Sequence, residues 1–223
     1  MKTPVCFLLF TIAAVAQTPV PAGPRAVTGL PYSMEQTTER VQTLADGTRI
    51  SQPAQKIAQY RDSAGRTRNE ITTTVAGPGA QTISTIIIMD PVSGLRYNLD
   101  TRNHVARKMP PLSPPPQGRA AAPLALQRPD ASSESLGTQV IQGITARGTR
   151  TTMTYPIGFS GNDRPIVSIN EMWMSIDLRI MLQSKMSDPR FGDSTTTLNS
   201  FSQAEPDPTL FQIPADYQVV EGR

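Results

Sequence analysis

Residues 167–186 read VSINEMWMSIDLRIMLQSKM, two apolar stretches on either side of the turn residues Ser175, Ile176 and Asp177. After the turn, one face of the alternation holds Leu178, Ile180, Leu182 and Met186, and the other holds Arg179, Gln183 and Lys185. A period of two is that of a β-strand with one buried and one solvated face. The stretch therefore predicts an antiparallel β-hairpin.

The same signature continues on both sides of this hairpin. Runs rich in Thr, Val and Ile, such as residues 66–75 and 144–155, are separated by turn residues about every 10–15 positions, which is typical of all-β proteins. Two helical signals occur: residues 33–41 could open as a helix, because Ser33 and Gln36 resemble a capping box, and residues 207–211 predict one capped turn. We expect a mainly β fold, a curved antiparallel sheet or half-barrel of long hairpins, with few short helices and a proline-rich loop in the middle.

Composition divides the 223 residues into five segments. Residues 1–16 predict a signal peptide, with Lys2 before an apolar run and the small residues Ala14 and Ala16 at the cleavage point. The other expected segments are an extended leader (17–32), a first β half (33–111), a Pro- and Ala-rich linker (112–133) and a second β half (134–223). The linker could join two halves of one sheet or separate two lobes.

The expected signal peptide indicates a periplasmic or secreted protein. Its apolar run is too short to cross a hydrocarbon layer of ~30 Å, so we expect no stable membrane span after cleavage. The formal net charge of +3 is too small to indicate a nucleic-acid partner.

Few residues are available for metal or cofactor chemistry. Cys6 is the sole cysteine and lies in the expected signal peptide, and His104 is the sole histidine. A thiolate site in the mature chain and a multi-histidine metal site are thereby excluded. We expect neither a metal nor a cofactor.

Catalytic motifs are equally sparse. Residues 158–162 read GFSGN, which is not a nucleophile elbow because Asn162 stands where the motif requires glycine. Four acidic residues occur in Pro- or Gly-containing contexts that are typical of turn formers, namely Asp188, Asp193, Glu205 and Asp207. We expect that the protein is not an enzyme.

Glu171 is the one acidic residue in an unusual place. It falls between Ile169 and Trp173 on one face of a predicted strand, where an unpaired carboxylate would be costly to bury. A structural ion pair with Arg150 or Arg179 is the commoner explanation. A hydrolase based on Glu171 or Asp188 is kept as a distant third hypothesis.

Two groups of residues are candidates for binding. Methionine side chains line adaptable surfaces, and the candidate site for an apolar ligand comprises Met172, Trp173, Met174, Leu182 and Met186. The alternative is a core filled by methionine in place of aromatic residues. A weaker candidate for phosphate or anionic lipid comprises Arg61, Arg66 and Arg68. Its alternative is a charged solvent face.

Three stretches together resemble an uncharacterised family of exported bacterial proteins, which lends no activity and no site. They are TLADGTRI (43–50), YRD with GRTR (60–68) and AEPDP with LFQIPADY (204–217). A looser similarity is to half-barrel envelope proteins of the lipoprotein-carrier type and of the anti-sigma-regulator type. It is based on Trp173 before a hairpin turn and on the closing segment 210–217. That similarity implies a curved antiparallel sheet around an apolar cavity that takes an acyl chain.

The leading hypothesis is an exported, non-enzymatic β-sheet protein that binds an apolar ligand, such as a lipid or acyl chain, or an envelope partner. The alternative is a structural or regulatory periplasmic interaction module with no small-molecule ligand. The two differ in whether the Met/Trp face encloses a cavity or is packed solid.

Overall fold

The computed structural model describes residues 26–75, 81–110 and 129–222. The expected signal peptide (1–16), most of the expected leader (17–25) and residues 112–128 of the expected linker lie outside the described residues. The leader residues 26–32 and the last residues of the linker are described, and β8 begins at Asp130.

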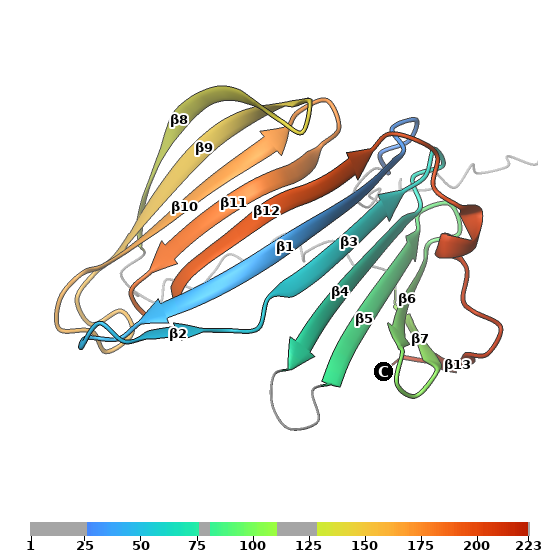
Figure 1. Cartoon of the computed structure of the whole chain (residues 1–223), viewed down its shortest axis with the longest axis horizontal. Coiled ribbons are helices and arrows are strands. Elements are labelled where there is room, and N and C mark those ends of the chain that lie inside the picture. Colours follow the sequence, from blue (N-terminus) through green and yellow to red (C-terminus); the bar gives the residue numbers. More distant parts are fainter. Residues whose placement is uncertain (1–25, 76–80, 111–128, 223) are drawn as a thin grey trace, which may run out of the picture.

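Thirteen strands account for most of the described chain (Figure 1). They are β1 (Tyr32–Thr43), β2 (Arg49–Ser51), β3 (Gln55–Arg61), β4 (Thr67–Val75), β5 (Gln81–Asp90), β6 (Leu95–Asp100), β7 (Val105–Met109), β8 (Asp130–Ile141), β9 (Ile144–Tyr155), β10 (Ile166–Ser175), β11 (Ile180–Asp188), β12 (Gly192–Ser202) and β13 (Gln218–Glu221). One short 3-10 helix, η1 (Pro208–Phe211), precedes β13. The mainly β fold predicted from the sequence is confirmed.

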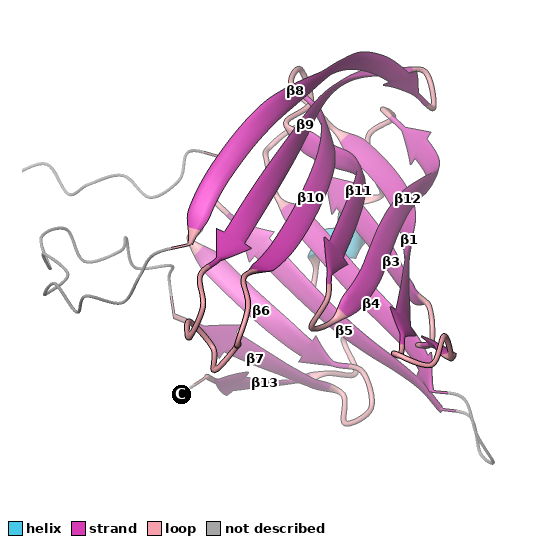
Figure 2. Cartoon of the chain, turned by 90° about the vertical axis from the view of Figure 1, so that its left-hand side faces the viewer, coloured by secondary structure: helices cyan, strands magenta, loops and turns pink. Residues whose placement is uncertain are grey.

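All thirteen strands form one open sheet in the order β13-β7-β6-β5-β4-β3-β1-β12-β11-β10-β9-β8, with the short β2 paired to β1. Neighbouring strands are antiparallel except β13, which runs parallel to β7. Strands from both sides of the linker thus belong to one sheet, because β1 pairs with β3 on one side and with β12 on the other. Figure 2 shows the sheet curving so that β8–β11 lie in front of β4–β7, as in a half-barrel.

The expected helix at residues 33–41 is wrong, because this segment lies in β1. A capping box is a local signal, and here the pairing of this segment with β3 and β12 on its two sides overrides it. The capped turn at residues 207–211 is confirmed. The side chain of Asp207 accepts a hydrogen bond from the backbone N–H of Thr209, and Pro208 begins η1.

Cross-strand partners point to the same side of a sheet, so the register defines its two faces. One row across the sheet joins Ile83, Thr73, Gln55, Thr38, Thr196, Ser184 and Met172. We call this side the Thr38 face. The opposite side, which carries Glu35, Ala58 and Glu70, is called the Glu35 face.

Side chains on the Thr38 face of β1 and β3 reach the hairpin between β10 and β11, so the sheet closes toward this face. Nε2 of Gln36 donates to the carbonyls of Met181 and Leu182, at 3.0 and 3.2 Å. Nη2 of Arg61 donates to the carbonyl of Leu178, at 2.8 Å. These contacts make the Thr38 face the concave one.

Two apolar clusters stabilise the sheet. The first lies where the β10–β11 hairpin meets β1 and β12, and its buried members are Tyr32, Met34, Ala146, Leu178, Ile180, Leu182 and Leu198. The second lies on the Glu35 face of β5–β7, and its buried members are Ile86, Ile88, Leu99 and Ala106. Ile213 and Tyr217 from the C-terminal segment pack against the second cluster. The C-terminal segment therefore covers the convex side of the sheet.

Candidate functional site

Three of the candidate apolar residues lie on the Thr38 face. Met172 is opposite Ser184, whose other neighbour is Thr196 of the Thr38 row. Met174 lies two residues along the same strand, and Met186 lies two residues beyond Ser184. Met172 and Met174 are half-buried, and Met186 is 39% exposed. The register thus gives the three methionines one face in common with Thr38.

Trp173 lies between two of these methionines and points to the other side of β10. Its cross-strand neighbours are Gly148 and Gln183. The indole covers Gly148 so closely that a Cβ at residue 148 would lie 2.7 Å from the ring. Trp173 also packs against the first apolar cluster. It therefore stabilises the fold and does not share a surface with Met172 and Met174.

Leu182 is a core residue. Its side chain is fully buried in the first cluster, and its carbonyl accepts a hydrogen bond from Gln36. The register between β10 and β11 shifts between Trp173 and Met174, which leaves Leu182 as the extra residue of a bulge. Of the five candidates, the structure thus brings together Met172, Met174 and Met186 and separates Trp173 and Leu182 from them.

Sequence reasoning missed the other half of this surface. Ile57 is opposite Gln36, Ile71 is opposite Ile57, and Ile83 ends the Thr38 row. Ile71 is 39% and Ile83 49% exposed. The three isoleucines lie in three different strands, so no local pattern links them, and only the pairing of β3, β4 and β5 shows that these side chains share a face. The concave side therefore carries exposed apolar groups on both arms of the sheet.

The three candidate arginines all have partners within the chain. Arg61 is 5% exposed, stacks over Tyr32 and donates to two backbone carbonyls. Nε of Arg66 pairs with Asp62 at 2.5 Å. Nη2 of Arg68 pairs with Glu70 at 3.0 Å. Each guanidinium already has partners within the chain, so these residues stabilise the fold. Arg66 and Arg68 remain partly exposed.

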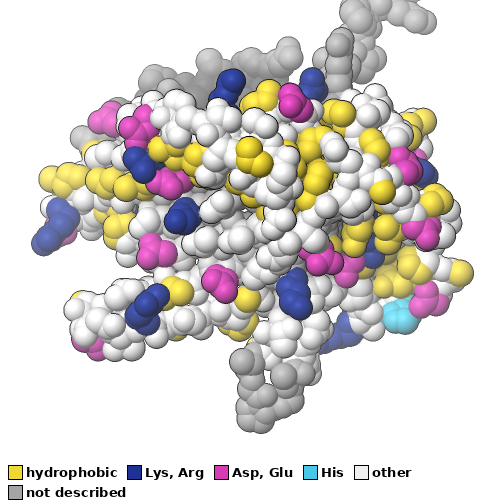
Figure 3. Space-filling model, turned by 45° about the horizontal axis from the view of Figure 1, so that its top comes forward, with side chains coloured by type: hydrophobic (Ala, Val, Ile, Leu, Met, Phe, Trp, Pro, Cys, Tyr) yellow, Lys and Arg dark blue, Asp and Glu magenta, His cyan; other side chains and the backbone are white. Residues whose placement is uncertain are grey.

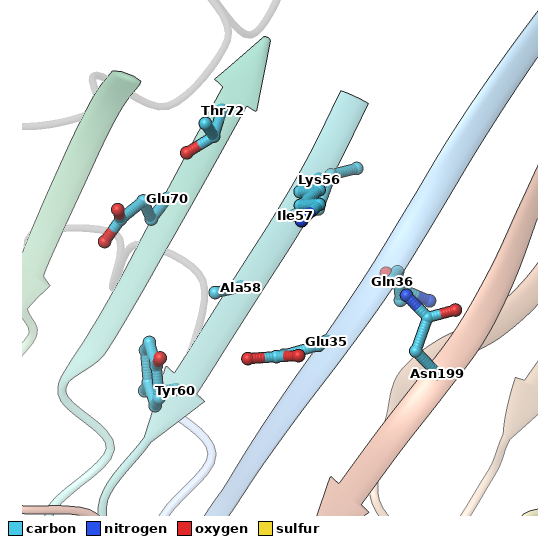
Figure 4. A pocket seen from close by; sticks show the side chains of 9 residues that line it. All are labelled: Glu35, Gln36, Lys56, Ile57, Ala58, Tyr60, Glu70, Thr72 and Asn199. Carbon is cyan, nitrogen blue, oxygen red and sulfur yellow. The ribbon is translucent and has the colours of Figure 1, made fainter. Parts of the chain in front are cut away.

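A polar groove of about 360 Å³ lies mainly on the Glu35 face, over β1, β3 and β4 (Figure 4). Ala58 has the smallest side chain in the lining of the groove, and Glu35 and Glu70 lie opposite it in the two neighbouring strands. Burial raises the pKa of Tyr60, and the charges of Glu70 and Glu35 raise it further. Carboxylates and hydroxyls on the walls make this groove unsuited to an acyl chain.

The carboxylates considered for catalysis are held by arginines. Nε and Nη2 of Arg150 donate to Oε1 of Glu171, at 2.9 and 2.7 Å, which confirms one of the two expected ion pairs. Asp188 accepts bonds from the backbone and guanidinium of Arg190, which lower the pKa of the Asp188 carboxyl. Asp188 is thus a turn former, as expected. In both cases the carboxylate is committed to a structural bond.

Of the other three expected turn formers, Asp207 bonds its local backbone, whereas Asp193 lies within β12 and Glu205 bonds a residue that is distant in sequence. Glu205 accepts from the backbone N–H of Ser63 at 3.0 Å, and Asp207 caps η1. His104, in the turn between β6 and β7, lies 2.9 Å from Asp216 and stacks on Tyr217, which joins the turn to the C-terminal segment. Within the described residues, no group of three His, Cys, Asp or Glu side chains could hold a metal ion. No helix among them is long and apolar enough to cross a membrane.

Comparison with known proteins identifies no family. No protein-family model matches the chain, and no curated protein matches it. Several solved structures are similar in fold, three of them as follows. An uncharacterized conserved protein from Thermus thermophilus is 14% identical, with a TM-score of 0.44 over 86% of this chain and 91% of that one. MucB, solved in complex with MucA(peri), is 14% identical, with a TM-score of 0.39 over 86% of this chain and 57% of MucB.

The third is a LolA-superfamily protein from Nitrosomonas europaea, which is 10% identical, with a TM-score of 0.34 over 84% of this chain and 92% of that one. The solved structures thus include both kinds of protein that the looser sequence similarity named. The likeness concerns the fold alone.

Proposed function

We propose that this chain is an exported, non-enzymatic protein that binds an apolar ligand, a lipid or acyl chain, on the concave Thr38 face of its sheet. One observation carries the proposal. Met172, Met174 and Met186 lie on the same face as Ile57, Ile71 and Ile83, and several of these side chains remain exposed. Exposed apolar side chains gathered on one concave face are typical of binding surfaces.

The centre of the Thr38 row needs no polar partner from a ligand. Thr38 and Thr196 bond to each other through their hydroxyls at 2.8 Å, so their polar groups are satisfied without a partner. Both threonines are buried, so the ligand contacts would come from the exposed side chains Met186, Ile71 and Ile83 on this face. Burial of apolar area supplies affinity at roughly 25 cal/mol per Å², before the cost of association.

Met186→Asp and Ser187→Asp are a matched pair that tests the proposal. The two residues are neighbours in β11 and point to opposite faces, and both are exposed enough to accept a polar group. Protein purified from the compartment to which it is exported is examined by native mass spectrometry. We expect the wild type and Ser187→Asp to carry an extra mass that is released in organic solvent, and Met186→Asp to lack it.

A defined probe gives a second readout. Dansyl-labelled undecanoic acid should fluoresce more strongly with the wild type and with Ser187→Asp than with Met186→Asp. Circular dichroism checks that both variants are folded. A bare chain mass together with no probe binding would overturn the proposal and favour the interaction module without a small-molecule ligand.

A further inference from the structure

The two ends of the sheet are closed to different extents. At one end, β13 is only four residues long and runs parallel to β7. At the other end, β8 has twelve residues, and within the described part of the chain β9 is its only partner. A long edge strand offers unpaired N–H and C=O groups to another strand. Edges are commonly protected by lysine, proline or bulges.

Protection of β8 is incomplete. Residues 130–141 contain neither lysine nor proline. The register with β9 shifts between Ser135 and Gly137, and Gly137 adopts a φ of 81°. A bulge of this kind ends regular pairing. Residues 130–135, before the bulge, therefore form a regular open edge of six residues.

A ladder of alternating charge ends at this edge. Along one row of the Glu35 face the residues are Glu39, Thr195, Lys185, Glu171, Arg150 and Glu134. Arg150 bonds Glu171 at 2.7 Å on one side and Glu134 at 2.5 Å on the other. The Glu134 side chain remains 60% exposed. Figure 3 shows acidic and basic side chains interspersed over one face of the molecule.

We propose that residues 130–135 of β8 bind an extended segment of a partner protein as an added strand, with a lysine or arginine opposite Glu134. The added strand would satisfy the open backbone edge, and its basic residue would continue the ladder beyond Glu134. A second copy of β8 fits poorly, because residues 130–141 carry Asp130 and Glu134 and no basic residue. Like charges placed opposite each other destabilise strand pairing.

Two synthetic peptides test the charge rule on the full chain. Thr-Val-Thr-Lys-Thr-Val-Thr and its counterpart with glutamate in the centre are titrated by fluorescence anisotropy, while hydrogen exchange follows the backbone amides of β8. We expect the lysine peptide to bind about three- to tenfold more tightly, because its central charge opposes that of Glu134. We also expect slower exchange for the amides of residues 130–135 when it is bound.

Variants at Glu134 test whether its charge causes the preference between the two peptides. Glu134→Lys should reverse the preference between the two peptides, and Glu134→Gln should remove it without adding a repulsive charge beside Arg150. Glu39→Lys makes the same change of charge at an exposed site in β1, at the far end of the ladder, and should leave the preference intact.

Three results would overturn the inference: no slowing of β8 exchange at millimolar peptide, a preference for lysine that survives in Glu134→Gln, or dimerisation of the chain through β8. Met186→Asp should not affect peptide binding, because it lies on the opposite face. Failure at the edge is thus distinguishable from failure of the proposed apolar site.

Discussion

Replacing Gln36 should destabilise the protein more than replacing any other polar side chain of β1. Gln36 is 1% exposed, and its Nε2 donates to the carbonyls of Met181 and Leu182. These carbonyls lie where β11 is no longer paired with β12, since the register between them ends at Ser184. The amide of Gln36 thus replaces a missing strand-to-strand contact.

The magnitude for Gln36→Met follows from these two bonds. Methionine has a similar length but no donor, so two buried carbonyls lose their partner at about 1–3 kcal/mol each. The unpartnered Oε1 of Gln36 partly offsets this loss, because removing it relieves an unsatisfied acceptor. We expect a net loss of roughly 2–4 kcal/mol, which is a large part of a typical domain stability of about 5–15 kcal/mol.

Urea unfolding monitored by Trp173 fluorescence measures this change, with Gln52→Met at an exposed site as the control. Gln36→Glu extends the test. A buried carboxylate that faces two carbonyl oxygens has a raised pKa, so the stability of this variant should be highest below about pH 4.3 and fall as the pH rises through the folded-state value. Surface substitutions usually change the free energy of unfolding by no more than about 0.5 kcal/mol. A change of that size or smaller for Gln36→Met would refute the assigned role.

Three further outcomes are expected. Gly148→Val should lower the free energy of unfolding by about 1–3 kcal/mol, because its side chain overlaps the indole of Trp173, and should cost less in a Trp173→Ala background, as a double-mutant cycle would show. Arg190 lowers the pKa of Asp188, so the stability that this pair contributes is present above pH 3.8 and is lost as the pH falls through the folded-state pKa. In acid unfolding, the wild type should therefore lose more stability than Asp188→Asn. Phe211→Ala should cost roughly 3 kcal/mol in thermal unfolding, because the ring is buried.

Patterns of period two were sufficient to predict the fold class. Leu178, Ile180 and Leu182 were placed together from alternation alone, and all three are buried in the first cluster. Met186 continues this pattern but lies beyond the cluster and is 39% exposed. Alternation therefore assigns a face to a residue, whereas the depth of burial depends on which strands curve over it.

The candidate site was predicted in part, and the missing part has two causes. Met172 and Trp173 are adjacent in sequence, so the alternation already required opposite faces for them; grouping them by residue type hid this. Arg61 failed for a different reason. Its partners, the carbonyls of Leu30 and Leu178, are separated from it by 31 and 117 residues, and no local pattern reveals them.

Strand β10 explains how one segment can serve two kinds of contact. Its even positions carry Met172 and Met174 on the side that the register shares with Thr38, whereas its odd position Glu171 belongs to the charge ladder that ends at Glu134. A shift of one residue in the register would exchange the two sets, exposing the carboxylate to the apolar side and the methionines to the ladder. The bond between Arg150 and Glu171 opposes such a shift, because it forms in one register only. The charged face therefore fixes the register that keeps the concave face apolar, and the two proposed binding surfaces depend on the same pairing.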